Sequence, residues 1–506
     1  MSGETVLRLA GITKRFGPLI ANDTISISLN RGEIVALLGE NGAGKTTLMN
    51  ILFGHYTADE GSIEVFGKPL PAGEPRAAIA AGIGMVHQHF TLAENLSVLE
   101  NIMLGTEHLW RLSSDRAGGR RRIETLAKSF GLGVAPDARV GDLSVGERQR
   151  VEILKALYRD ARILILDEPT AVLTPQESVN LFATLKQLTA DGLSIIFISH
   201  KLNEVMTASD RIYVLRSGRI VAERAKSATN RQELAELMVG RPVPEPKAEP
   251  QAPGPVQVEL TDVTAKGLDR VTLAIHGGEI LGLAGVSGNG QSALADLLSG
   301  LLTPTSGAVR LFGEAIHPWT PNRLSELGVG RIPEDRHATG LISGMSAMEN
   351  AVTERYRDQP FSRASLFDWP AVTRFTEKII ADYDVKCPSP RADVRTMSGG
   401  NMQKLILGRV LSSDPRFILA CQPVRGLDVG AIAYVHAQLI AARKAGASIL
   451  LISDDLDEIL GLSDRVAVMY RGQISAPVAR ASATVEGIGL LMAGHGFAHG
   501  AEAHAA

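Results

Sequence analysis

The sequence predicts an α/β fold that is built twice, as two similar domains joined by a short linker. The chain has 506 residues, 45% of them hydrophobic, and this length is too great for one ordinary core. Short apolar runs alternate with segments of helical spacing, which is typical of a largely parallel sheet flanked by helices. A glycine-rich loop at 39–46 recurs in altered form at 285–292, which indicates duplication.

The spacing of matching motifs supports a duplicated domain. Gly39 and Gly285 are 246 positions apart (285 − 39), whereas Ser144 and Ser398 are 254 positions apart (398 − 144). A period this long excludes a solenoid of short repeats. Proline-rich segments stay extended and cannot pack a core, so they mark a linker. We predict a first domain at 1–240, a linker at 241–256, a second domain at 257–493 and a flexible tail at 494–506.

Bulk composition limits the classes of function. The net charge is −3, so there is no basic excess for a phosphate backbone, and we expect no nucleic-acid partner. Two cysteines, Cys387 and Cys421, exclude a disulfide framework and a four-cysteine zinc site, which favours a reducing cytoplasm. No apolar run reaches the ~18 residues that span a bilayer, and a secretion signal is missing. We therefore expect a chain that is soluble by itself and needs other subunits for any transport role.

The first glycine loop has the context of a triphosphate site. An apolar run, Glu33–Leu38, enters the loop, and a helical segment, Thr46–Phe53, leaves it. Glycines let backbone N–H groups approach a β-phosphate, while Lys45 would reach the β- and γ-phosphates and the Thr46 hydroxyl would bind Mg²⁺. The loop therefore predicts ATP binding by Gly39, Glu40, Asn41, Gly42, Ala43, Gly44, Lys45, Thr46 and Thr47.

A second apolar run, Arg162–Leu166, ends in two acids, Asp167 and Glu168. Two surface acids at a strand end would look the same, but His200 ends another apolar run 32 positions after Glu168 (200 − 168). We predict that Asp167 binds Mg²⁺ through water and that Glu168 polarises the attacking water. The chain is therefore predicted to be an ATPase with ATP and Mg²⁺ as cofactors.

Each half also carries a serine–glycine motif before a helix, LSVGERQ at 143–149 and MSGGNMQ at 397–403, whose backbone N–H groups could form an anion nest. The ordered set of glycine loop, serine–glycine signature, acidic strand end and histidine resembles the ATP-binding-cassette (ABC) family over nearly the whole chain. The resemblance implies two fused P-loop NTPase domains, each with a mixed, largely parallel sheet and a helical subdomain. Residues 89–143, which break the strand–helix rhythm, are the candidate subdomain of the first half.

The resemblance also implies roles for single residues. Gln88 would touch Mg²⁺ and sense a membrane partner, His200 would be a catalytic histidine that contacts the γ-phosphate, and Phe16 would stack on adenine. Because family cassettes pair head to tail, the loop of Lys45 would meet the second signature. The implied metal ligands are Thr46, Gln88 and Asp167, and the implied trans partners are Ser398, Gly399, Gly400 and the D-loop residue Asp428.

The second site has lost these groups. By the two offsets, Lys45 becomes Gln291, Asp167 becomes Cys421, Glu168 becomes Gln422, His200 becomes Asp454, Gln88 becomes Glu334 and Phe16 falls on Asp262. The sequence gives no reason for acids at Glu334 and Asp454. We predict one hydrolytic site and a degenerate one formed by Gly285, Gly288, Gly290, Gln291, Ser292, Ser144 and Gly146.

Two fused cassettes with a degenerate second site resemble the energising subunit of a bacterial importer for simple sugars or nucleosides. The segments MVHQHF at 85–90 and GVSGNGQS at 285–292 favour the nucleoside branch. This type implies two integral-membrane permease subunits, an extracytoplasmic solute-binding lipoprotein and a peripheral position on the cytoplasmic face of the inner membrane. A permease loop is predicted to dock on residues 89–104, in a groove lined by Phe90, Leu92, Leu96 and Val98.

Two alternatives remain at this level. One is a soluble twin-cassette ABC ATPase that acts on ribosomes or nucleic acid, and the other is an exporter ATPase of similar build. The only basic cluster is Arg120–Arg122, which a solvated helix face explains better than a nucleic-acid site. The short proline-rich linker and the loss of the second acidic pair also favour the importer.

Overall fold

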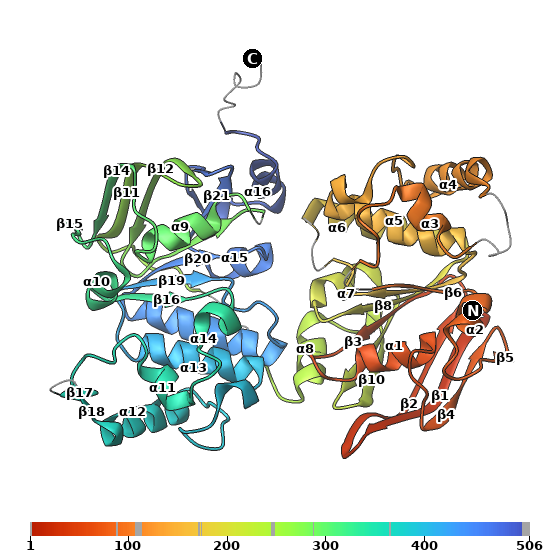
Figure 1. The fold of residues 1–506 in the computed structure, drawn as a ribbon, viewed down its shortest axis with the longest axis horizontal. Helices are drawn as coiled ribbons and strands as arrows, with labels where there is room; N and C mark the ends of the chain where they lie inside the picture. The colour runs from red at the N-terminus through yellow and green to blue at the C-terminus, as the bar shows by residue number, and fades with distance from the viewer. Residues whose placement is uncertain are drawn as a thin grey trace. The chain divides into compact units, whose positions relative to one another are not determined.

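The computed structural model describes residues 3–87, 90–106, 114–170, 173, 175–243, 248–286, 288–363 and 366–497. The chain divides into two compact units, residues 1–243 (unit 1) and 244–506 (unit 2), which are described separately (Figure 1). Each unit has a small antiparallel sheet, a larger and mostly parallel sheet, and flanking helices. The predicted α/β fold is confirmed in both halves.

Unit 1 contains two sheets. The antiparallel sheet has the order β2-β1-β4-β5, with β1 at Thr5–Phe16, β2 at Leu19–Asn30, β4 at Glu60–Val65 and β5 at Lys68–Pro69. The larger sheet has the order β10-β9-β3-β8-β7-β6, with β3 at Ile34–Leu38, β6 at Ile83–Val86, β7 at Ile163–Asp167, β8 at Ser194–Ser199, β9 at Arg211–Arg216 and β10 at Arg219–Ala225. Five of these six strands are parallel, and only β10 is antiparallel to its neighbour.

The helices of unit 1 fall into two groups. Helix α1, Lys45–Phe53, belongs to the core that the two sheets share. The segment predicted as a helical subdomain forms α3, Val98–Met103, and α4, Arg116–Phe130, which pack on α5, Val145–Tyr158 (Figure 1). The remaining helices are α2 at Pro75–Ala80, α6 at Pro175–Ala190, α7 at Leu202–Ala208 and α8 at Arg231–Val239.

Unit 2 repeats this plan with small additions. Its antiparallel sheet, β12-β11-β14-β15, uses Leu268–His276, Val256–Ala265, Ser306–Leu311 and Glu314–Ala315. Its larger sheet, β16-β19-β20-β13-β21-β22, uses Val329–Ile332, Phe417–Cys421, Ser448–Ile452, Ile280–Ala284, Arg465–Tyr470 and Gln473–Ile474, and β23, Val478–Ala479, also pairs with β21. A two-stranded hairpin, β17 at Ser362–Arg363 and β18 at Leu366–Phe367, is separate.

The helices of unit 2 follow the order of unit 1. They are α9 at Gln291–Leu298, α10 at Pro321–Glu326, α11 at Ala347–Val352, α12 at Trp369–Asp382, α13 at Gly399–Leu411, α14 at Val429–Lys444, α15 at Leu456–Leu462 and α16 at Val485–Met492. A π-helical turn at Arg336–Gly340 follows β16. Within the described residues, none of the helices combines the length and the apolar content needed to cross a membrane.

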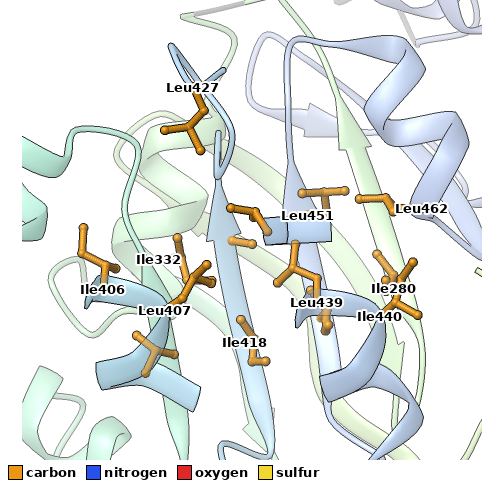
Figure 2. Close-up of a cluster of buried hydrophobic side chains, with 14 of the residues drawn as sticks. Ile280, Ile332, Ile406, Leu407, Ile418, Leu427, Leu439, Ile440, Leu451 and Leu462 are labelled. Atoms are coloured by element: carbon orange, nitrogen blue, oxygen red, sulfur yellow. The ribbon is translucent and has the colours of Figure 1, made fainter. Parts of the chain in front are cut away.

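The core of unit 2 shows why the central strands are continuous apolar runs. Ile418 of β19 and Leu451 of β20 are fully buried and meet Leu407 of α13 and Leu439 of α14 on one face of the sheet (Figure 2). The opposite face packs on α9 and the antiparallel sheet. Burial of one such side chain stabilises the fold by roughly 1.5–3 kcal/mol. The strand ends that carry the site residues are therefore held by a dense core on both sides.

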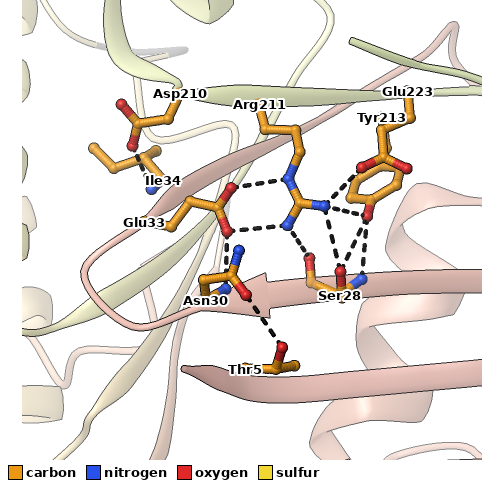
Figure 3. Close-up of polar contacts among 9 residues, drawn as sticks. All are labelled: Thr5, Ser28, Asn30, Glu33, Ile34, Asp210, Arg211, Tyr213 and Glu223. Atoms are coloured by element: carbon orange, nitrogen blue, oxygen red, sulfur yellow. Dashed lines mark hydrogen bonds and ion pairs between the residues drawn. The ribbon is translucent and has the colours of Figure 1, made fainter. Parts of the chain in front are cut away.

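A half-buried arginine connects the two sheets of unit 1 (Figure 3). Arg211 of β9 donates from Nε to Glu33 at 2.8 Å and from Nη2 to the Ser28 carbonyl of β2 at 2.9 Å. In unit 2, Arg465 makes the same connection to Glu279 and to the carbonyl of Ala274. The same arginine, glutamate and backbone carbonyl contacts in both units support duplication.

The ends of the units can be compared with the predicted boundaries. Val243, inside the predicted linker, is buried in unit 1, and the Gly254 N–H donates to the Gly277 carbonyl at 2.8 Å in unit 2. The ring of Phe497 packs on Tyr470 with 5.5 Å between centroids. The first residues of the predicted tail therefore lie against unit 2, and the rest of the tail lies outside the described residues.

Candidate functional site

Lys45 is held inside its own glycine loop. The loop follows β3, and the side chain of Lys45, the first residue of α1, donates from Nζ to the carbonyls of Gly39 at 2.7 Å and Glu40 at 2.9 Å. Burial lowers the pKa of Lys45, and the carboxylates of Glu168 and Asp167 oppose that shift. A buried cation whose hydrogen bonds go to neutral carbonyls favours additional negative charge beside it. A triphosphate would supply that charge.

Two glycines of this loop are required by close packing. A Cβ on Gly39 would lie 2.4 Å from the Leu215 carbonyl, and one on Gly44 would lie 2.3 Å from the Ala21 carbonyl. Gly44 also has φ +103°, in the left-handed region that favours glycine. The loop is therefore fixed in shape by its neighbours β9 and β2. The other loop residues occupy the turn before and the first turn of α1: Glu40, Asn41, Gly42, Ala43, Thr46 and Thr47.

The acidic strand end and the histidine meet across neighbouring parallel strands. Asp167 ends β7 and His200 follows β8, and His200 Nδ1 lies 2.7 Å from Glu168 Oε1. Burial raises the pKa of Glu168, but the hydrogen bond and charge of His200, together with the charges of Lys45 and Lys201, outweigh it and hold this pKa below its usual value. Glu168 has φ +46°, so the chain turns sharply there. The turn presents an ionised carboxylate beside the glycine loop.

Asp167 is a buried carboxylate with a raised pKa. Burial, followed by repulsion from Glu168, raises the pKa of Asp167 to about 6, although Lys45 acts in the opposite direction. Carboxylate and hydroxyl oxygens are suitable ligands for Mg²⁺, whose other ligands are usually phosphate and water oxygens. Asp167 and the Thr46 hydroxyl therefore fit a Mg²⁺ ion brought by ATP. The third predicted ligand, Gln88, lies outside the described residues.

The second glycine loop keeps the shape and lacks the charge. Gln291 begins α9 and donates from Nε2 to the Val286 carbonyl at 3.0 Å, while its Oε1 is buried without a partner among the described residues. Burial raises the pKa of Cys421 to about 12, so its thiol is neutral. Gln422 keeps the sharp turn with φ +47°, and its Oε1 accepts from the Asp454 N–H at 3.4 Å. Neutral groups therefore replace the cation and the base.

The two signature helices differ at their first turn. In unit 1, the N–H and hydroxyl of Ser144 both donate to the Glu147 carboxylate, at 2.9 and 2.8 Å, in a capping box. In unit 2, the Ser398 hydroxyl accepts from the Asn401 amide at 2.9 Å and makes no cap bond to the α13 backbone within the described part of the chain. The helix dipole is thus partly neutralised at Ser144 and stays available to an anion at Ser398.

The first signature also has less room for a ligand. Val145 is 39% exposed, and a Cβ on Gly146 would lie 2.4 Å from the Glu177 carboxylate. By contrast, a Cβ on Gly400 would lie 3.9 Å from Asp428 Oδ2, at the start of α14. In the described residues, the acidic groups therefore crowd the first signature more closely than the second. The first-half D-loop positions Ala171, Val172 and Thr174 lie outside the described residues.

Phe16 lies at the tip of the β1–β2 hairpin with a second aromatic residue that the sequence analysis missed. Its ring is 43% exposed and is 5.6 Å from the ring of Tyr56, which is also exposed and follows α1 closely. The Lys14 ammonium lies 5.5 Å from the Phe16 ring. An exposed aromatic pair near a glycine loop suits a base-stacking role. The signal for Tyr56 was its place two residues after the helix C-cap glycine.

The hairpin of unit 2 is shorter than that of unit 1. Leu9 pairs with Ile27, 18 positions further on, whereas Leu260 pairs with Leu273, 13 positions further on. The offset between the halves therefore changes within the hairpin. A constant offset of 246 cannot be carried back to the first strand.

The predicted match of Phe16 with Asp262 is consequently wrong. Asp262 stands at the bulge that Gly11 occupies in unit 1, and both have positive φ, +52° and +62°. Phe16 belongs to the longer hairpin tip, which has no counterpart in unit 2. The conclusion that unit 2 lacks this aromatic residue still holds, for a different reason.

Two of the three arginines in the basic cluster pair with acids on the same surface. Arg120 pairs with Asp137, and Arg122 pairs with Asp160 at 2.7 Å while its guanidinium lies 4.8 Å from the Tyr158 ring. These ion pairs reduce the positive charge that the cluster could offer to a phosphate backbone. The solvated helix face is the better interpretation of Arg120–Arg122.

A family model described as "ABC transporter" matches residues 22–171 and 268–425 of the chain. The chain is 43% identical over 502 residues to the nucleoside import ATP-binding protein NupA of Lactococcus lactis, covering 98% of this chain and 99% of that protein. It is 44% identical to the guanosine import ATP-binding protein NupO of Bacillus subtilis, covering 97% and 98%. It is 40% identical to the ribose import ATP-binding protein RbsA 2 of Rubrobacter xylanophilus, covering 96% and 93%.

Proposed function

Because the chain belongs to the ABC transporter family, whose ATP-binding cassette it carries twice, we propose that it is the ATP-hydrolysing subunit of a bacterial importer that takes up a nucleoside. One observation carries the proposal. The Lys45, Glu168 and His200 cluster is complete in unit 1, on a chain similar over nearly its full length to two nucleoside-type import ATPases. The similarity to ribose import proteins keeps a simple sugar as the second candidate solute.

Hydrolysis takes place at the site of unit 1. The Glu168 carboxylate accepts a proton from a water as the water oxygen attacks the γ-phosphorus, and the bond from the γ-phosphorus to the β–γ bridging oxygen breaks, so that ADP leaves with that oxygen and inorganic phosphate is formed. His200 holds Glu168 in place through the 2.7 Å contact, and Lys45 balances charge on the β- and γ-phosphates. Mg²⁺, held by Asp167 and Thr46, would supply further charge neutralisation between these phosphates.

The complete site is composite in this proposal. Ser398, Gly399 and Gly400 of unit 2 offer a helix start without a capping carboxylate, which suits the γ-phosphate held by Lys45. Asp428 of the D-loop belongs to the same surface of unit 2. In the degenerate site, Ser144 and Gly146 would meet the loop of Gln291 and Ser292, where both sides lack what a triphosphate needs.

The partners are two integral-membrane permease subunits and an extracytoplasmic solute-binding lipoprotein, and the chain is peripheral on the cytoplasmic face of the inner membrane. Val98 is fully buried, so its predicted place in the docking groove is wrong. A cavity of about 140 Å³ lies beside the end of β6 instead. We assign the docking groove to this cavity, whose lining includes Phe53, Met85, His87, Glu152, Lys155 and Arg159.

Cysteine cross-linking tests the docking groove. A cysteine at position 155, on the α5 wall of the cavity, is expected to cross-link to a permease loop, whereas one at position 121 on α4 is not. Cross-links only from position 121 would contradict the assignment. A cysteine at position 90 tests, in the same experiment, the segment 89–104 that the sequence predicts as the docking surface.

Uptake measurements test the solute. Disruption of this gene is expected to abolish uptake of a labelled nucleoside while ribose uptake persists, and the wild-type gene should restore uptake whereas the Glu168→Gln gene should not. Loss of ribose uptake alone would shift the proposal to the sugar branch. Unchanged uptake of both, with co-purification of ribosomes, would favour the soluble-ATPase alternative.

A further inference from the structure

Arg336 connects two functional loops of unit 2. It begins the π-helical turn after β16, and its Nη1 donates to the Arg425 carbonyl at 2.8 Å while Nη2 reaches the Gly426 carbonyl at 3.5 Å. Arg425 and Gly426 directly precede Asp428 in the D-loop. Burial lowers the pKa of Arg336, Asp335 opposes this, and Arg425 adds to it. Arg336 is therefore half-buried, and its guanidinium is hydrogen-bonded to the backbone carbonyls of the D-loop.

The same guanidinium lies against the signature. A Cβ placed on Gly399 would be 3.3 Å from Nε and 3.4 Å from Nη2 of Arg336, and a Cβ on Gly426 would be 3.2 Å from Nη2. The planar group therefore fills the space between a signature glycine and a D-loop glycine. The contact between the turn and α13 extends this connection along the helix.

Unit 1 has no cation at the corresponding places. Position 90, which matches Arg336, is Phe90, and position 171, which matches Arg425, is alanine. Among the described residues the connection is found in unit 2, the half whose signature completes the Lys45 site in the proposed function. It also explains the acid at Glu334, which forms an ion pair with the exposed side chain of Arg425. Such an exposed pair contributes little stability, so Arg336 carries the connection.

We propose that Arg336 is a positioning residue for ATP hydrolysis at the Lys45 site. It holds the signature and the D-loop at a fixed separation, so that Ser398, Gly399 and Asp428 meet the triphosphate as one preformed surface. The proposal rests on the proposed function, in which unit 2 completes that site. Donors aligned in advance cost no reorganisation during reaction, and a misplacement of about 1 Å costs about 10²-fold in rate.

Replacement of Arg336 tests the proposal in the full-length chain, co-purified with its membrane subunits. Arg336→Met is expected to lower kcat by about 10²-fold while the affinity for a fluorescent ATP analogue stays unchanged, because the Lys45 loop belongs wholly to unit 1. Arg336→Lys keeps the charge but not the planar fork, so it should recover only part of kcat. Arg323→Met is the control, since Arg323 on α10 is exposed and pairs with Glu326 at 3.2 Å.

The possible outcomes separate this proposal from the proposed function. Wild-type kcat in Arg336→Met, or full recovery by Arg336→Lys, would overturn the positioning role. If nucleotide affinity and thermal stability fall together with kcat, Arg336 only stabilises the fold. That result would also overturn the positioning role. Glu168→Gln is measured in parallel, because hydrolysis by that variant would show that the proposed function itself is wrong.

Discussion

At the scale of single residues, the two halves differ in charge more than in shape. Lys45 and Gln291 are both buried at the start of a helix, and both donate to carbonyls of their own loop. Glu168 and Gln422 share the same left-handed turn. Because position and backbone are kept, these positions of unit 2 differ from those of unit 1 by the loss of ionised groups. Single substitutions can therefore test each charge separately.

Glu168→Gln is expected to abolish most hydrolysis while ATP still binds. The amide keeps the size of the side chain and removes the base, and general-base catalysis contributes about 10²–10⁴-fold. The measurement is ATPase rate together with nucleotide affinity. Turnover close to that of the wild type would remove Glu168 from the role of base.

Lys45→Ala and Gln291→Ala form a matched pair. The first substitution removes a buried cation from the phosphates and should lower the ATPase rate by about 10²–10³-fold, as for loss of one electrostatic donor. The second removes a neutral amide and should leave substantial activity. Equal losses in the assembled transporter would show that the second site also hydrolyses ATP.

Asp167→Asn should stabilise the nucleotide-free chain in a pH-dependent way. The folded pKa of Asp167, about 6, lies above its value in an unfolded chain, so the ionised side chain destabilises the fold fully above pH 6. That penalty decreases as the pH falls and vanishes below about pH 4, where Asp167 is protonated in both states. A shift of this size corresponds to about 1–3 kcal/mol. Urea unfolding at pH 7.5 and pH 4 measures it, and a gain that persists at pH 4 would contradict this origin.

At the scale of elements, the two signature helices differ in how their first turns are capped. Helix α5 begins with a complete capping box, in which Ser144 and Glu147 satisfy each other. Helix α13 begins with Ser398, whose hydroxyl is engaged only by the Asn401 side chain among the described contacts. A capping side chain accepts a hydrogen bond from a backbone N–H group in the first turn, so that group is not available to a ligand. Without such a cap, the N–H groups of the first turn remain available.

Ser144→Ala and Ser398→Ala should therefore have opposite effects. Loss of the Ser144 cap is expected to cost about 1 kcal/mol of stability with little change in ATPase rate. Loss of the Ser398 hydroxyl should leave the melting temperature nearly unchanged and lower the ATPase rate. Thermal unfolding and hydrolysis are measured on both variants. The reverse pattern would mean that the head-to-tail assignment of the signatures is wrong.

At the scale of the whole molecule, the chain is the ATPase subunit of an importer, and in the proposed function separate permease subunits carry the solute. A cavity beside β6 has both apolar and charged walls. In the proposed function, closure of the ATP site is coupled to the permease loop that docks in this cavity.

The purified chain is expected to hydrolyse ATP only weakly, and added membrane subunits should raise the rate. In the proposed function, the permeases hold the two cassettes in the geometry that closes the site. ATPase assays with and without the subunits in lipid nanodiscs test this. Full turnover of the chain alone, unaffected by the subunits, would contradict the proposed coupling.

The sequence by itself determined the α/β fold, the duplication and the identity of the chemical groups. The glycine loop around Lys45 and the acids after β7 are contiguous segments, and their physics is local: a turn that needs glycine, or a buried strand that ends in charge. The loss of charge at Gln291 was equally visible, because it is a substitution within one such segment.

Only the tertiary structure decided how distant segments meet. The contact of His200 with Glu168 depends on the adjacency of β7 and β8, and the contact of Arg336 with the Arg425 carbonyl joins residues 89 positions apart. The match of Phe16 with Asp262 failed because strand pairing, not residue count, sets the register. The burial of Val98 on α3 likewise depends on α4 and α5, which pack against that helix. Such contacts are set by long-range packing, which no local pattern encodes.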